Sequence, residues 1–136
     1  MTLGVRDVAR ATAFYLALGW PLSPASVDGE VSFFNTAGGL LALWNIEEME
    51  RDTGRRMTAV GAGGTANAIN LDSRAQVDEA FDAVARAGGT IVKAPVATDW
   101  GGYTGYIADL DGHLWEIAHN PGWPTGPDER PQLPRA

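Results

Sequence analysis

Cysteine, long apolar runs and basic clusters are missing from this sequence, and each absence excludes a class of function. The chain has no cysteine, which excludes disulfides, thiolate nucleophiles and cysteine-ligated zinc sites. No apolar run approaches the ~18 residues that a transmembrane helix needs, and no basic segment followed by an apolar one marks a secretory signal. We therefore expect a cytoplasmic protein that does not contact a membrane.

Positive charge is scarce as well. Ten Lys and Arg residues stand against seventeen Asp and Glu residues, for a formal net charge of −7. The basic residues form no cluster that could neutralise several phosphates, so nucleic acid is not an expected partner. With 136 residues, 45% of them apolar, the chain is long enough for one compact core and too short for two ordinary domains.

What the sequence does contain is an order of elements that occurs twice. The first copy predicts a strand at residues 2–5, a helix capped by Asp7, and strands near residues 20–26, 31–35 and 40–44. The buried side of the helix follows the i, i+3, i+4, i+7 spacing of Ala11, Phe14, Tyr15 and Leu18. An acidic segment after the third strand, residues 47–52, is expected to form one or two solvated helical turns.

The second copy repeats this order. A strand at residues 67–71 leads to Ser73, which with Gln76 forms a capping box at the start of a helix. The buried residues predicted for that helix are Val77, Ala80, Phe81, Val84 and Ala85. Strands follow at residues 90–96, 103–109 and 114–118.

These elements predict an α+β fold made of two modules. Module one covers about residues 1–52 and module two about residues 66–120, with a glycine-rich link at residues 53–65. Together they form one domain over residues 1–120, and residues 121–136 are a proline-rich tail. A half-size unit with one apolar sheet face cannot bury that face alone, so two modules must pair, within the chain or between chains.

The last predicted hairpin holds the first candidate functional residue. Asp109 and Gly112 supply turn chemistry between its strands. In the second strand Glu116 shares a face with its neighbours two positions away, whereas Trp115 and Ile117 point to the other face. A carboxylate on an apolar strand face is costly unless it is paired. Glu116 is therefore a structural acid bonded to Tyr hydroxyls or a Trp N–H, a general base with a raised pKa, or a metal ligand.

Aromatic residues are the candidates for lining a ligand pocket. Trp44, Trp100, Tyr103 and Tyr106 offer the flat surface that binds organic molecules, with a place in the core as the alternative for each. Two glycines follow Trp100, which is typical of a mobile cleft edge. His113 and His119 have a strand parity opposite to that of Glu116, so the three residues cannot converge on a metal without a bulge.

Two segments carry a resemblance to a known family. "LGVRDVARATAFYLALGW" at residues 3–20 and "GYIADLDGHLWEIAHNP" at residues 105–121 resemble the vicinal oxygen chelate superfamily, which holds glyoxalase I, extradiol dioxygenases, and bleomycin and fosfomycin resistance proteins. The resemblance implies two paired βαβββ modules whose curved mixed sheets enclose a cleft for a small organic molecule. It also implies a homodimer.

The resemblance further implies a set of metal ligands, usually His, Glu or Gln, on the first and fourth strands of each module. Only Glu116 matches such a position; the first strand of module two offers Asn67 and Asn70, residues 40–44 offer no ligand, and one position would fall before Met1. We therefore expect no cofactor, and a metal-free or metal-poor pocket in which Glu116 orients or deprotonates the ligand and Asn70 contacts it.

Two alternatives remain open at this stage, and with them the question of whether the protein is an enzyme. The first is a metal-dependent lyase, isomerase or dioxygenase, with a divalent metal completed by Asn70, by a partner chain or by residues upstream of Met1. The second is a module that sequesters a drug-like compound without turnover.

Overall fold

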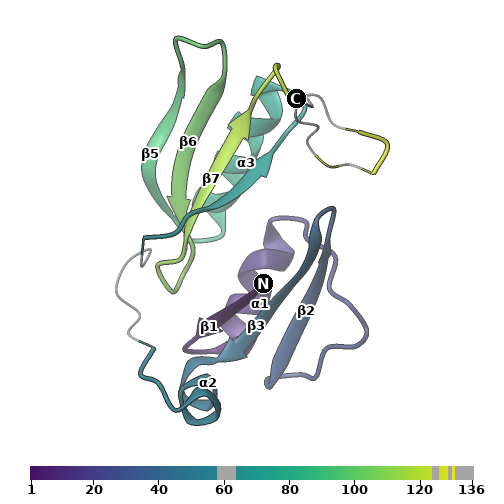
Figure 1. Ribbon diagram of the computed structural model, residues 1–136, viewed down its shortest axis with the longest axis vertical. Helices are drawn as coiled ribbons and strands as arrows, with labels where there is room; N and C mark the ends of the chain where they lie inside the picture. Colours follow the sequence, from purple (N-terminus) through teal and green to yellow (C-terminus); the bar gives the residue numbers. More distant parts are fainter. Residues whose placement is uncertain (58–63, 124–125, 129, 131–136) are drawn as a thin grey trace, which may run out of the picture.

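The computed structural model describes residues 1–57, 64–123, 126–128 and 130. Figure 1 shows two groups of elements, each with a helix against a sheet. The first group consists of β1 (Thr2–Val5), α1 (Val8–Ala17), β2 (Val31–Thr36), β3 (Gly39–Asn45) and α2 (Ile46–Thr53). The second consists of β4 (Asn67–Asn70), α3 (Arg74–Arg86), β5 (Thr90–Ala97), β6 (Tyr103–Ala108) and β7 (Leu114–His119). The predicted link and tail lie partly outside the described residues.

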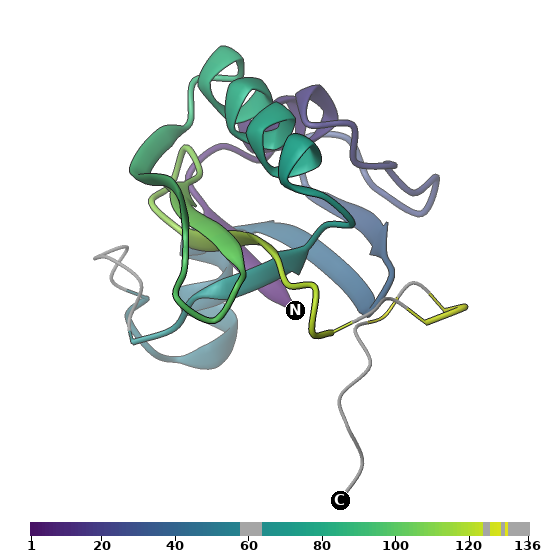
Figure 2. The ribbon, with the colours of Figure 1, turned by 90° about the horizontal axis from the view of Figure 1, so that it is seen from above.

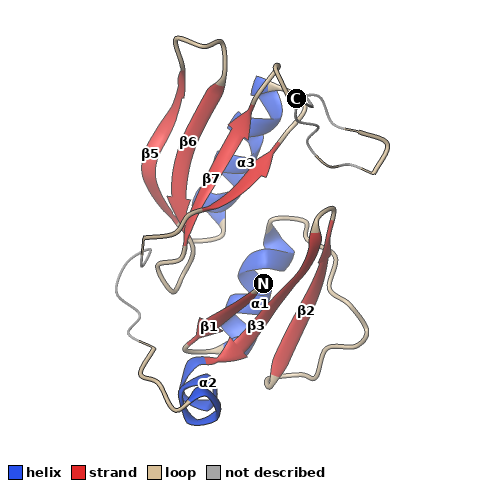
Figure 3. Ribbon diagram, viewed as in Figure 1, coloured by secondary structure: helices blue, strands red, loops and turns tan. Residues whose placement is uncertain are grey.

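Both sheets are mixed, which confirms the predicted α+β class (Figure 3). The first sheet has the strand order β1-β3-β2, with β1 parallel and β2 antiparallel to β3. The second has the order β4-β7-β6-β5, with β4 parallel to β7 and the other pairs antiparallel. The strand before each helix thus lies beside the last strand of its own module, as a repeated unit requires.

The first module departs from the prediction at residues 20–26. We expected a strand there, but the segment makes only an isolated bridge between Leu22 and Phe34. Pro21 and Pro24 explain the difference, because proline has no backbone N–H to donate to a ladder. The prediction of a strand at residues 20–26 was therefore wrong. Two strands follow the first helix instead of three, and the first sheet has three strands against four in the second.

The predicted helix starts are confirmed in atomic detail. The Asp7 carboxylate accepts a hydrogen bond from the Arg10 N–H at 2.9 Å. The Ser73 hydroxyl accepts one from the Gln76 N–H at 3.2 Å. The return bond of the capping box goes to the residue before the cap, since Gln76 Oε1 accepts from the Asp72 N–H at 2.9 Å.

Each helix covers one face of its own sheet, and Figure 2 shows α1 and α3 on the same side of the molecule. Of the stripe predicted for α3, Val77, Phe81 and Val84 are buried, and Ala80 packs partly against the core. Ala85 is exposed, contrary to the prediction, because it lies beyond the edge of the face defined by the other residues. No helix in the described ranges combines the length and the apolarity of a membrane span.

The two modules contact one another within the chain through a buried polar link. The Tyr15 hydroxyl on α1 donates to Asp109 Oδ2 at 2.7 Å and accepts from Trp115 Nε1 at 3.1 Å. Burial, followed by the negative charge of Asp109, raises the pKa of Tyr15 well above its usual range. Beside this link the Arg6 N–H donates to Asp111 Oδ1 at 3.0 Å. The turn of the last hairpin is therefore docked on the end of β1.

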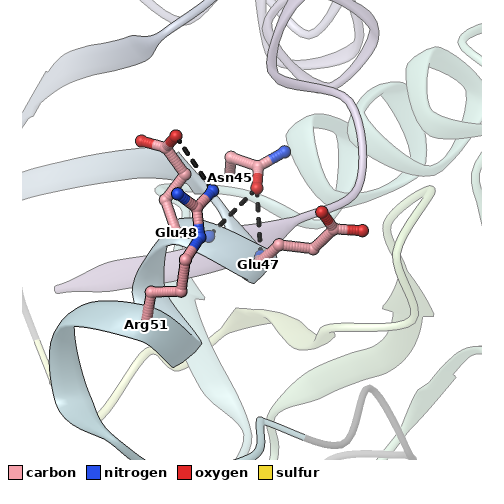
Figure 4. A network of polar contacts seen from close by, with 4 residues as sticks. All are labelled: Asn45, Glu47, Glu48 and Arg51. Atoms are coloured by element: carbon pink, nitrogen blue, oxygen red, sulfur yellow. Dashed lines mark hydrogen bonds and ion pairs between the residues drawn. The ribbon is translucent and has the colours of Figure 1, made fainter.

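The acidic segment after β3 forms α2, with eight residues and an exposed acidic side as predicted. The Asn45 side-chain oxygen caps this helix by accepting from the backbone N–H groups of Glu47 at 3.0 Å and Glu48 at 3.2 Å (Figure 4). Arg51 pairs with Glu48 at 3.2 Å on the solvated surface. Exposed pairs of this kind contribute little to stability, so the network fixes the helix start and nothing more.

Candidate functional site

Glu116 lies on the face of the second sheet opposite α3, which we call the open face. Its neighbours across the strands are Tyr106 on β6 and Ala68 on β4. Trp115 and Ile117 point the other way and are buried, so the predicted alternation is confirmed. Glu116 is half-buried, and the Thr104 hydroxyl donates to its Oε1 at 2.9 Å. The carboxylate is thus held in one orientation by a β6 side chain.

Tyr106 is electrostatically coupled to Glu116. The negative charge of Glu116 is the main cause of a raised pKa at the Tyr106 hydroxyl, and partial burial and a hydrogen bond to Glu116 act in the same direction. Because an ordinary tyrosine already titrates near pH ~10, Tyr106 stays protonated at neutral pH and remains a hydrogen-bond donor. The open face therefore presents a carboxylate with a phenol beside it.

Neither histidine joins this pair. His113 Nε2 lies 2.8 Å from the Gly4 carbonyl oxygen, where the last hairpin meets β1. His119 Nδ1 lies 3.0 Å from the Leu71 carbonyl oxygen at the end of β4. Each ring nitrogen in these contacts donates to a backbone oxygen, because a carbonyl oxygen can only accept.

The donor set around Glu116 does not suit a transition metal. Within the described parts of the chain, no group of three His, Asp or Glu side chains is placed to hold an ion. The polar neighbours of Glu116 are the hydroxyls of Thr104 and Tyr106, and Asn70 lies on the adjacent strand. Imidazole or several carboxylates normally supply affinity for such metals, so one carboxylate with hydroxyls and an amide is a poor site.

A cavity of about 680 Å³ lies between the modules, bordered by β4 and by the hairpin of β2 and β3. Trp20 and Trp115 line it, and their rings meet edge to face at 5.4 Å between centroids. The amides of Asn35, Asn67 and Asn70 also line it. The volume falls in the ~300–1,000 Å³ range of small-molecule sites, and the mixture of aromatic surface with a few polar groups is typical of them.

Glu116 is next to this cavity. Ala68 lines the cavity and is also the partner of Glu116 in the register of β4 and β7. Adjacent strands are separated by about 4.8 Å, so the carboxylate lies one strand away from the cavity lining. Neither Glu116 nor Tyr106 lines the cavity, so a ligand would have to extend across β4 to contact them.

The structure separates the other aromatic residues that we predicted for the pocket. Trp44 is half-buried on the face of the first sheet opposite α1. Trp100 is 60% exposed in the turn between β5 and β6, with its ring against Gly102. Tyr103 points to the α3 side, where its hydroxyl donates to Asp78 at 2.8 Å. Of the predicted set, only Asn70 lines the cavity, and only Tyr106 stands beside Glu116.

Sequence reasoning missed Trp20, Trp115 and Arg130 as lining residues of the cavity. Trp115 was expected on the strand face opposite Glu116, and it is buried on that face while one part of it lines the cavity. Trp20 follows the end of α1 without any periodic pattern around it. No local signal marks these three residues as neighbours, because they come from distant parts of the chain.

Comparisons with known proteins agree with this architecture. A family model described as the Glyoxalase/Bleomycin resistance protein/Dioxygenase superfamily matches residues 1–117. A glyoxalase-related enzyme from Fulvimarina pelagi is 34% identical, with 98% of this chain and 94% of that chain covered and a TM-score of 0.88. No match was found among curated proteins.

Two further solved structures are similar at lower identity. A lactoylglutathione lyase from Agrobacterium tumefaciens is 26% identical, with 88% of this chain and 90% of that chain covered and a TM-score of 0.68. A glyoxalase/bleomycin resistance protein/dioxygenase from Nocardioides is also 26% identical, with 88% and 80% covered and a TM-score of 0.68.

Proposed function

Because this chain belongs to the glyoxalase/bleomycin resistance protein/dioxygenase superfamily, we propose that it binds a small organic molecule in the cavity between its two modules. The observation that carries the proposal is the lining of that cavity, where two indole rings and three amides are among the groups that border about 680 Å³. Aromatic surface supplies affinity for a flat molecule, and the amides fix its orientation by hydrogen bonds.

In this proposal Glu116 orients or deprotonates the ligand. Thr104 donates to one carboxylate oxygen at 2.9 Å, which holds the group in place for a hydrogen bond or a proton from the ligand. Tyr106 stays protonated beside it and donates a hydrogen bond to the carboxylate or to a ligand oxygen. No metal takes part, since the donor set around Glu116 does not suit one.

Blocking the cavity tests the binding site. Ala68 is exposed on β4 and lines the cavity, so Ala68→Phe fills space without disturbing the core. Ala94→Phe is the matched control, because Ala94 is exposed on β5 and does not line the cavity. Flat organic compounds that raise the Tm of the wild type should lose their effect in Ala68→Phe and keep it in Ala94→Phe. Equal loss or equal retention in both variants would reject the cavity as the site.

Turnover is tested with the compounds that bind. If Glu116 deprotonates the ligand, Glu116→Gln should abolish product formation while binding is retained, because glutamine keeps the shape and the Thr104 contact but accepts no proton. A compound that is bound and returned unchanged by the wild type identifies a sequestering protein, and the role of Glu116 is then orientation alone.

The likeness to a lactoylglutathione lyase favours a second candidate, a metal-dependent lyase or isomerase. In that case Glu116 would be one metal ligand, and the other ligands would come from residues that are not its neighbours. Elemental analysis after incubation with Ni, Mn, Fe, Co and Zn separates the two candidates. A stoichiometric metal in the wild type that is absent from Glu116→Gln would establish the second candidate and overturn the first.

A further inference from the structure

The cavity differs from the rest of the chain in its charge. The chain carries seventeen Asp and Glu residues, yet none of the described residues that line the cavity is acidic. Among these described residues Arg130 has the one cationic side chain, and the α-ammonium of Met1, which donates to the Leu40 carbonyl oxygen at 2.8 Å, is a second positive group. A protein of net charge −7 repels anions over most of its surface, so a lining with a guanidinium, an ammonium and no carboxylate is a local exception.

Contacts on several sides hold Arg130 at the cavity. Its Nε donates to the Ala37 carbonyl oxygen at 2.9 Å, in the turn between β2 and β3. Its backbone N–H donates to Asp128 Oδ1 at 3.2 Å, and its carbonyl oxygen accepts from the Gly126 N–H at 2.8 Å. Asp128 Oδ2 lies 3.8 Å from Nε, in a pair that is more than half exposed. The contacts with Gly126 and Asp128 therefore fix the backbone of Arg130, and the bond to Ala37 keeps its side chain at the cavity.

We propose that the ligand of this cavity is a flat organic anion, and that Arg130 recognises its carboxylate. This inference rests on the proposed function, because it names the class of ligand for the same cavity. The guanidinium is a planar fork whose N–H groups match the two oxygens of a carboxylate. The ring of such a ligand contacts Trp20 and Trp115, and the amide groups of Asn67 and Asn70 border the same space.

The position of Arg130 in the chain gives this proposal a further consequence. The family match ends at residue 117, so the arginine belongs to a segment outside it. The modules supply the hollow and its aromatic lining, and Arg130 supplies the cationic side chain. Ligand class then depends on Arg130, which can be changed without altering the two modules.

A matched pair of probes tests the inference, namely 2-naphthoate and its neutral analogue 2-naphthamide. Both have the same ring system, and quenching of tryptophan fluorescence or calorimetry reports their affinities at one fixed salt concentration. We expect the wild type to bind the carboxylate about tenfold more tightly than the amide, which corresponds to ~1.4 kcal/mol. Arg130→Ala should remove this preference while leaving the affinity for the amide within about twofold, since a charge-assisted contact is lost and the ring contacts remain.

Arg51→Ala is the control, because it removes the same charge from the exposed surface of α2. It should leave the preference intact. A preference that survives in Arg130→Ala, or is lost equally in Arg51→Ala, would overturn the inference. If both probes bind the wild type equally and are blocked by Ala68→Phe, the cavity is a ligand site and the anion specificity fails. If neither probe binds, both the cavity as an aromatic site and the inference about its charge are refuted.

Discussion

The hydroxyl of Tyr15 offers the sharpest test of how the two modules are held together. It lies between Asp109 and Trp115 of the other module, and all three side chains are buried. Tyr15→Phe removes this one oxygen without changing the ring. Asp109 then loses one donor, worth about 1.5–3 kcal/mol for a charged acceptor, and the Trp115 N–H loses its acceptor at ~1–3 kcal/mol. Allowing for local relaxation, we expect a loss of about 2–4 kcal/mol in the free energy of unfolding.

Chemical unfolding at neutral pH measures this loss directly, and thermal unfolding should show a Tm lower by roughly 8–16 °C. Tyr106→Phe is the matched control, because it removes the same atom from a half-buried tyrosine on the open face. Its cost should stay below ~1 kcal/mol. A Tyr15→Phe variant within ~0.5 kcal/mol of the wild type would refute the claim that this hydroxyl links the modules.

The pH dependence of the stability provides an independent check, because the direction of the change is fixed in advance. Burial raises the pKa of Tyr15 above that of the unfolded chain, so the folded state keeps this proton when the unfolded state has lost it. The stabilisation is complete below pH ~10 and declines as the pH rises further, by about 1.4 kcal/mol per pH unit. Phenylalanine does not titrate. The stability difference between wild type and Tyr15→Phe should therefore shrink above pH ~10. A constant difference would contradict the claim that the Tyr15 hydroxyl keeps its proton in the folded state.

Three further predictions concern other parts of the fold. Glu116→Gln should shift the titration of Tyr106, followed by ultraviolet absorbance, to lower pH, since the charge of Glu116 is the main cause of the raised pKa; an unchanged curve would show that the two groups are not coupled. Gly105→Ala should cost about 2–4 kcal/mol by chemical unfolding, because its Cβ would lie 2.6 Å from a carbonyl oxygen of β5, whereas Gly38→Ala meets nothing within 4 Å and should be nearly neutral. Asp7→Ala should cost ~1 kcal/mol through loss of the helix cap, and Asp7→Ser should restore most of it; equal costs would show that the cap does not contribute.

The sequence alone determined the features that depend on neighbouring residues. Strand β1, the caps at Asp7 and Ser73, and the hairpin with its turn at Asp109 follow from short-range patterns. The inward and outward faces around Glu116 follow from the strand period of two. The same period could have separated Tyr103 from Tyr106, since residues three apart on a strand lie on opposite faces.

The tertiary structure decided which residues share a cavity. Trp20 and Trp115 meet only because the segment after α1 packs against β7 across the modules, and no short-range pattern records that contact. Arg130 reaches the cavity through a bond to Ala37, a residue far away in the chain. Periodicity and turn chemistry act over a few residues, whereas the composition of a cavity depends on how whole elements pack. The elements could therefore be predicted from the sequence, and the site between them could not.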